Sequence, residues 1–164
     1  MLARVTVKII LPFVCSWARK QEALILAKGN RLTDAQIADA KTVGVQEPER
    51  VRVCSVKKVP LPLFGVLRRA GEKLRIVPDT IGIALGHGIF LRFDYSLDEE
   101  LLRHELAHVA QYERLGGLRP FLGCYLLECL TSGYPLGELE EEAAHISKGL
   151  TSRGTKVAET ARRP

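Results

Sequence analysis

The chain of 164 residues has no long apolar run, no paired cysteine motif and no internal repeat. Without about 18 consecutive apolar residues, a membrane-spanning helix is not expected. The cysteines, at Cys15, Cys54, Cys124 and Cys129, include no C-x-x-C pair, which argues against a cysteine zinc site. Scattered cysteines in apolar surroundings are typical of reduced core residues, so a cytoplasmic location is favoured.

A concentrated basic face is also missing from the body of the chain. The formal net charge is +5, and three of these charges belong to the tail at residues 151–164. The rest of the chain therefore lacks the basic surface typical of nucleic-acid-binding proteins, and we expect no nucleic-acid partner. Only the basic tail, which is polar and predicted to be disordered, suggests the alternative of a DNA-associated protein. Nothing in the sequence specifies an oligomeric state.

The first eighteen residues have some features of a signal peptide. Arg4 and Lys8 come before or at the edge of a short apolar run at residues 9–15. That run contains Pro12, and its helical pattern continues through residues 24–26. We therefore predict an amphipathic N-terminal helix, with export as the alternative to a cytoplasmic location.

Apolar periodicity and turn residues predict an α+β fold that is mainly helical, with a small antiparallel sheet beside the central helix. Residues 1–150 are predicted to form one domain, in which 1–45 are a helical scaffold and 80–147 hold the candidate site. Helices are expected at 1–28, 34–43 (capped by Thr33), 63–74, 97–115, 120–130 and 138–150. Strands are expected at 50–56 and, as a glycine-interrupted pair, within 80–92.

The most informative stretch is His104-Glu105-Leu106-Ala107-His108, an H-E-x-x-H motif inside a predicted helix. Residues four apart lie on one face of a helix, so His104 and His108 can bind one Zn²⁺ ion. Glu105 can then act as a general base toward water. Ser96 is the predicted N-cap of this helix, and Gly116-Gly117 the predicted end. The motif predicts zinc as cofactor and a peptide or protein as substrate.

A catalytic zinc site needs a third protein ligand. One common arrangement has a histidine six residues after the second histidine of the motif, but this position is Arg114. In the predicted acidic helix, Glu140 and Glu142 flank the apolar face at similar angles, and His145 lies on the Glu142 side. The residues around Glu140 are small and allow another helix to approach. We predict Glu140 as the third ligand, with Glu142 and His145 as alternatives.

Two stretches, LRHELAHVAQY at 102–112 and LEEEA at 139–143, resemble gluzincin-type zinc metallopeptidases. The likeness is to the minimal-gluzincin and DUF4157-like domains and, more distantly, to M48 peptidases. It implies a zincin-like fold over about residues 80–147. In those families a glutamate in an E-x-x-A stretch is the third zinc ligand, a role that the resemblance carries to Glu140. M48 members usually have an aspartate after that alanine, where this chain has Ala144, so support of a histidine by that route is missing.

The implied reaction is hydrolysis of a peptide bond by zinc-activated water, with Glu105 moving the proton to the leaving amine. The candidate donors to the oxyanion are His87, Tyr125 and Tyr134, and His87 is also a weaker candidate as a ligand. An exposed strand edge within 80–92 would bind an extended peptide by β-augmentation. The alternative, of another class, is a non-catalytic zinc-stabilised interaction domain that binds the metal without hydrolysis.

Overall fold

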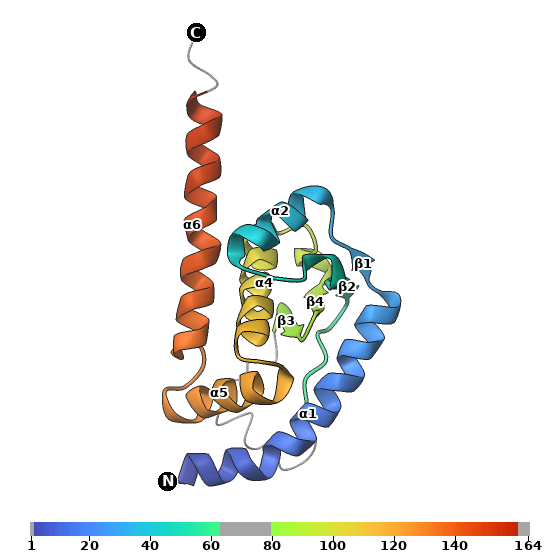
Figure 1. The fold of residues 1–164 in the computed structure, drawn as a ribbon, viewed down its shortest axis with the longest axis vertical. Helices are drawn as coiled ribbons and strands as arrows, with labels where there is room; N and C mark the ends of the chain where they lie inside the picture. The colour runs from blue at the N-terminus through green and yellow to red at the C-terminus, as the bar shows by residue number, and fades with distance from the viewer. Residues whose placement is uncertain (1, 63–79, 161–164) are drawn as a thin grey trace.

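The structure is a computed structural model that describes residues 2–62 and 80–160, with side chains to Gly149 (Figure 1). The helix predicted at 63–74 lies outside the described residues. In chain order the elements are α1 (Leu2–Lys28), β1 (Asn30–Arg31), α2 (Asp34–Val43), the 3-10 turn η1 (Pro48–Arg50), β2 (Arg52–Val56), β3 (Gly82–Leu85), β4 (Gly88–Arg92), the 3-10 turn η2 (Phe93–Tyr95), α4 (Glu99–Arg114), α5 (Leu118–Thr131) and α6 (Glu138–Thr160). Helices dominate around a small sheet, which confirms the predicted α+β class.

The four-stranded sheet has the order β1-β2-β4-β3 and is mixed, so the prediction of an antiparallel sheet is wrong for its central pair. β1 with β2 and β3 with β4 are antiparallel, but β2 and β4 are parallel. β3 and β4 form a hairpin through a two-residue turn, in which Gly86 has a φ of 64° that favours glycine. β2 reaches this hairpin through the long connection at 57–81, and such a connection allows two neighbouring strands to run the same way.

The sheet separates two apolar clusters because successive side chains of a strand point to opposite faces. On β4, Phe90 belongs to the cluster formed mainly with α1 and α5. Its neighbours Ile89 and Leu91 belong to the cluster formed mainly with α2 and α4. Figure 1 shows the result: α4 runs beside the sheet, and α1 runs along its other side. The helix with the H-E-x-x-H motif is thereby held against edge strand β3.

The start of α4 differs from the prediction. Asp98 is the N-cap, and its side chain accepts a hydrogen bond from the backbone N–H three residues on. Ser96 instead ends η2, and its hydroxyl donates to the carbonyl of Phe93 at 2.8 Å. The extra 3-10 turn moves the cap by two residues, so the predicted Ser96 cap is wrong. The Thr33 cap of α2 and the glycine turn after α4 are confirmed.

α5 and α6 form a helical hairpin that returns the chain to α4. α6 packs extensively on α4, and Figure 1 shows the first turns of α6 beside it. α5 begins at Leu118, two residues before the predicted start at Pro120. α6 continues to Thr160, through residues that the sequence predicted to be disordered.

None of the helices in the described part of the chain has an apolar stretch of the length that a bilayer crossing requires. All four cysteines are free: Cys15 and Cys129 are buried as predicted, Cys54 is partly buried, and Cys124 is exposed. The prediction of core cysteines is therefore wrong for Cys124.

Candidate metal centre

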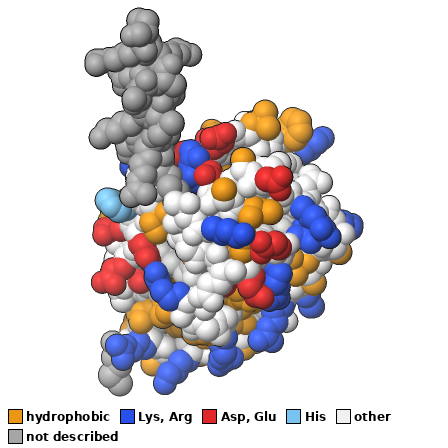
Figure 2. All heavy atoms as spheres, turned by 45° about the horizontal axis from the view of Figure 1, so that its top comes forward, with side chains coloured by type: hydrophobic (Ala, Val, Ile, Leu, Met, Phe, Trp, Pro, Cys, Tyr) orange, Lys and Arg blue, Asp and Glu red, His pale blue; other side chains and the backbone are white. Residues whose placement is uncertain are grey.

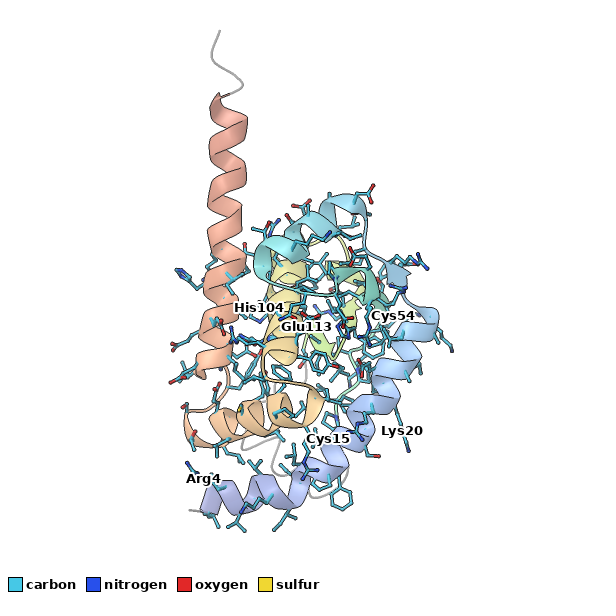
Figure 3. All side chains as sticks on the ribbon, in the orientation of Figure 1. Arg4, Cys15, Lys20, Cys54, His104 and Glu113 are labelled. Atoms are coloured by element: carbon cyan, nitrogen blue, oxygen red, sulfur yellow. The ribbon has the colours of Figure 1, made fainter. Side chains whose placement is uncertain are left out.

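α4 places the two histidines of the motif one turn apart, between the sheet and α6. Leu106 and Val109 on the same helix are fully buried against the sheet cluster. Beside them the His104 and His108 rings lie edge to face, with their centroids 4.8 Å apart. Their Nε2 atoms are 3.1 Å apart, so both point at the same place. In Figure 3, His104 lies between α4 and α6.

Glu140 on α6 completes a group of three donor atoms. Its Oε2 lies 3.2 Å from His104 Nε2, and its Oε1 lies 3.4 Å from His108 Nε2. A tetrahedral zinc ion with bonds of about 2.0 to 2.1 Å has neighbouring ligand atoms about 3.3 Å apart. The three separations match that spacing. These residues thus fit a zinc ion, and they form one of two such groups among the described residues.

The charges around this group favour a bound cation. Burial lowers the pKa of His108, but hydrogen bonding to Glu140 and the nearby Glu105 charge outweigh it and raise that pKa to about 9. Burial raises the pKa of Glu140, but its contacts with His104, His108 and Tyr125 outweigh this and hold the pKa well below its usual range. The site therefore retains a proton at neutral pH. A metal ion would supply the same positive charge.

Glu105 lies beside the group with one carboxylate oxygen unengaged. The residue is 4% exposed, and burial raises the pKa of its carboxyl despite the two nearby histidines. It accepts a hydrogen bond from the Ala84 backbone N–H on β3. Its Oε2 is buried and makes no hydrogen bond to any described residue. A buried carboxylate oxygen without a partner is costly, and a water bound between Glu105 and a metal ion would satisfy it.

Gly82 on β3 makes room for that carboxylate. A Cβ atom at this position would lie 2.5 Å from Glu105 Oε1, closer than side-chain atoms normally approach. β3 thus determines the position of Glu105 in two ways, by the Ala84 N–H and by the missing side chain of Gly82. One of the glycines in the predicted glycine-interrupted strand pair therefore allows a close approach of another side chain to the backbone.

A cavity of about 120 Å³ opens onto the same residues. His104, Glu105, His108 and Glu140 form its polar end. The remaining wall is mostly apolar and comes largely from three elements: Val14 and Trp17 of α1, Ile83 and Leu85 of β3, and Phe121 and Leu126 of α5. This volume suits one apolar side chain of moderate size.

Gln111 is a site residue that the sequence analysis missed. It is 1% exposed, and its Oε1 lies 2.8 Å from His108 Nδ1. Its Nε2 donates to the Leu139 carbonyl at 2.8 Å and to Glu142 Oε2 at 2.9 Å. Because both amide donors have acceptors, Oε1 must face the histidine and accept from Nδ1–H. This leaves His108 Nε2 available as a ligand.

The alternative third ligands point elsewhere. Glu142 forms a bidentate ion pair with Arg114, at 2.6 and 2.7 Å, and also accepts a hydrogen bond from Gln111. The Arg114 guanidinium is the main cause of the lowered Glu142 pKa. His145 is exposed on α6. The structure therefore brings Glu140, and neither alternative, to the histidine pair.

The two candidate tyrosines differ in what their hydroxyls contact. Tyr125 donates to Glu140 Oε1 at 2.5 Å, so its hydroxyl supports that carboxylate. Tyr134, in the turn between α5 and α6, lines the cavity and makes no hydrogen bond to any described residue. Burial, together with the charges of Glu140 and Glu105, raises the Tyr134 pKa to about 12, so its hydroxyl remains a donor. Of the two, Tyr134 is better placed to reach a substrate oxygen.

His87 is not among the residues that line the cavity. It lies at the β3–β4 turn, where its Nε2 is 2.9 Å from Glu113 Oε1 and 3.7 Å from Glu47 Oε2. These three residues form the second group that could hold a metal. However, the Glu113 carboxylate already accepts the backbone N–H groups of Gln46 and Glu47, and Glu47 pairs with Arg50. We interpret this group as a structural contact, and His87 is poorly placed as a ligand or oxyanion donor.

Comparisons of the chain with protein-family models, with curated proteins and with solved structures returned no match. The chemical interpretation therefore depends on the residues themselves. Its main support is the group of His104, His108 and Glu140 with Glu105 beside it.

Proposed function

We propose that the chain is a zinc-dependent metallopeptidase of the gluzincin type. The observation that supports this best is the arrangement of three donor atoms 3.1 to 3.4 Å apart, next to a buried carboxylate oxygen without a partner. Two neutral imidazoles and one carboxylate are a ligand set of catalytic zinc sites, which leave one position open. A purely structural zinc site would have a fourth protein ligand instead.

Each residue has a distinct part in this proposal. His104, His108 and Glu140 would hold a zinc ion, which when bound supplies the Lewis acidity that activates water and polarises a carbonyl. Glu105 accepts the proton of the attacking water on Oε2 and delivers it to the leaving nitrogen. Its raised pKa suits the first step, because such a carboxylate takes up a proton more readily. Tyr134 donates a hydrogen bond to the oxygen that becomes negative.

The surroundings of the site favour an extended peptide as the substrate. β3 is the last strand of the sheet, and all four of its residues line the cavity. A peptide added along this edge would pass the metal ligands and Glu105. The apolar wall of the cavity, which includes Trp17 and Phe121, would accept a hydrophobic side chain next to the bond that is cut.

Metal content tests the ligand assignment. We expect one zinc per chain in the purified protein, and a loss of bound zinc in His104→Ala, His108→Ala and Glu140→Gln. Two matched controls come from the same helix: Glu142→Gln and His145→Ala should keep the metal, because neither side chain contacts the group. One zinc per chain in Glu140→Gln would contradict the assignment.

Peptide cleavage separates the enzyme from a non-catalytic zinc domain. The wild-type protein should cut members of an unstructured peptide library, detected by mass spectrometry, and Glu105→Gln should bind zinc but cut none of them. Cleavage that survives Glu105→Gln would exclude the mechanism. Full zinc loading of the wild type without cleavage of any peptide would support the interaction domain.

A further inference from the structure

The first half of α1 has apolar side chains on two opposite faces. One face is buried: Val7, Val14 and Ala18 belong to the cluster shared with α5. Leu11 approaches α5 closely enough to contact a side chain added at Gly123. An amphipathic helix packed in this way would have a polar outer face. The outer face of α1 does not follow that rule.

Four large apolar side chains lie on the outer face. Leu2 is 82% exposed, Val5 48%, Ile9 63% and Phe13 69%. Their spacing of three, four and four residues places them along one side of the helix, opposite to the buried face. We call these four residues the α1 stripe. Exposed apolar side chains are ordinary when isolated, but a continuous row of them indicates a partner surface.

The charge around the α1 stripe has one sign. Residues 2–21 contain the cations Arg4, Lys8, Arg19 and Lys20 and no acidic residue. Arg119 on α5 adds a further cation near α1. Burial raises the pKa of Cys15 on α1, and the charge of Arg119 offsets part of this rise. Figure 2 shows Lys and Arg side chains along the lower rim of the molecule, with the acidic side chains above them. In Figure 3, Arg4 and Lys20 extend from α1, whereas Cys15 points inward.

We propose that the α1 stripe docks on an anionic membrane surface. A helix that combines an exposed Leu/Ile/Phe row with flanking Lys and Arg binds in the interface of a bilayer, where anionic headgroups attract the cations. α1 would lie in the plane of the surface and need not span it. A second copy of the chain fits less well, because a symmetric contact would bring the same cations together.

The test uses the full chain and vesicles of two compositions. We expect cosedimentation with vesicles of phosphatidylcholine containing about 30% phosphatidylserine, little with phosphatidylcholine alone, and weaker binding as salt rises. The pair Arg4→Gln and Lys8→Gln should weaken binding by about thirtyfold, because each cation near the surface contributes about fivefold. The pair Ile9→Ser and Phe13→Ser should weaken it by at least about tenfold.

Two exposed apolar residues just before α4, outside α1, give the matched control. Phe93 and Leu97 are 71% and 92% exposed, and the pair Phe93→Ser and Leu97→Ser should bind the vesicles like the wild type. Circular dichroism and zinc content should be the same for all variants, which separates this proposal from the metal site. Equal binding to both vesicle types, or binding unchanged by the α1 substitutions, would overturn the proposal. So would a solution dimer that Ile9→Ser with Phe13→Ser dissociates.

Discussion

Replacing Gly82 by alanine is the sharpest test of how β3 positions Glu105, the proposed general base. The new Cβ would lie 2.5 Å from Glu105 Oε1 and 3.0 Å from Cδ, whereas ordinary contact begins at 3.4 Å. The carboxylate must therefore move by about 0.9 Å. A displacement of about 1 Å at a reacting group lowers the rate by about a hundredfold. The backbone itself tolerates alanine, because Gly82 is not among the glycines with positive φ.

The same substitution should leave the proposed metal ligands in place. The atoms nearest to the added Cβ all belong to Glu105, and none belongs to His104, His108 or Glu140. We therefore expect Gly82→Ala to keep one zinc per chain while kcat for a cleaved peptide falls by about two orders of magnitude. Zinc content and kcat are measured on the same preparation.

Gly123→Ala on α5 is the matched control. A Cβ at this position meets only Leu11 Cδ2, at an ordinary 3.6 Å. This variant should keep both its zinc and its kcat, and the change within a helix should stabilise it by up to about 1 kcal/mol. Our account of Gly82 is wrong if Gly82→Ala has wild-type kcat, or if it loses zinc together with activity.

Three further predictions concern other residues of the site. Gln111→Leu removes the acceptor for His108 Nδ1–H, so a chelator competition should show zinc affinity weakened by about 10 to 100-fold; unchanged affinity would exclude this role. Tyr134→Phe should lower kcat by about a hundredfold at constant zinc content, and an unaffected kcat would remove Tyr134 from the mechanism. In metal-free protein, the His108 pKa of about 9 exceeds its ordinary value of 6.5, so protonation stabilises the fold fully below pH 6.5 and this contribution disappears as pH rises through 9. Urea unfolding of chelator-treated protein should therefore give a smaller free energy at about pH 10 than at about pH 6, and His108→Gln should reduce the difference.

Local patterns predicted most of the helices and the position of the candidate site. The i, i+4 spacing of His104 and His108 requires only a helix, and the α4 pattern is strong. Glu140 followed from its place beside the apolar face of the last helix and from the resemblance. These features depend on a few neighbouring residues, and the structure brings the three side chains together as expected.

The errors involve information that is not local. The parallel pairing of β2 with β4 joins strands that are far apart in the sequence, and the local pattern of a strand does not specify its partner. The cap moved from Ser96 to Asp98 because a 3-10 turn precedes α4. His87 was a candidate oxyanion donor, but its ring contacts Glu113 at the C-terminal end of α4 and does not line the cavity.

The sequence position of Gln111 already indicated a contact with His108. It lies three residues after His108, which places the two side chains on the same side of α4. A polar side chain there, beside a ligand and facing the next helix, is a natural support for the histidine. Its contacts with Leu139 and Glu142 on α6 could not be foreseen, because they depend on how the helical hairpin folds back.

Because the candidate ligands are divided between two helices, a bound metal ion would be a cross-link as well as a reagent. Glu140 follows His108 by 32 residues, and the whole of α5 lies between them. A zinc ion bound to both would close this loop in the manner of a disulfide, so its binding energy would add to the stability of the α4–α6 contact. Removal of zinc would then first weaken the contact between α6 and α4. In limited proteolysis of chelator-treated protein, the protease should cut at the α5–α6 turn before it cuts the sheet.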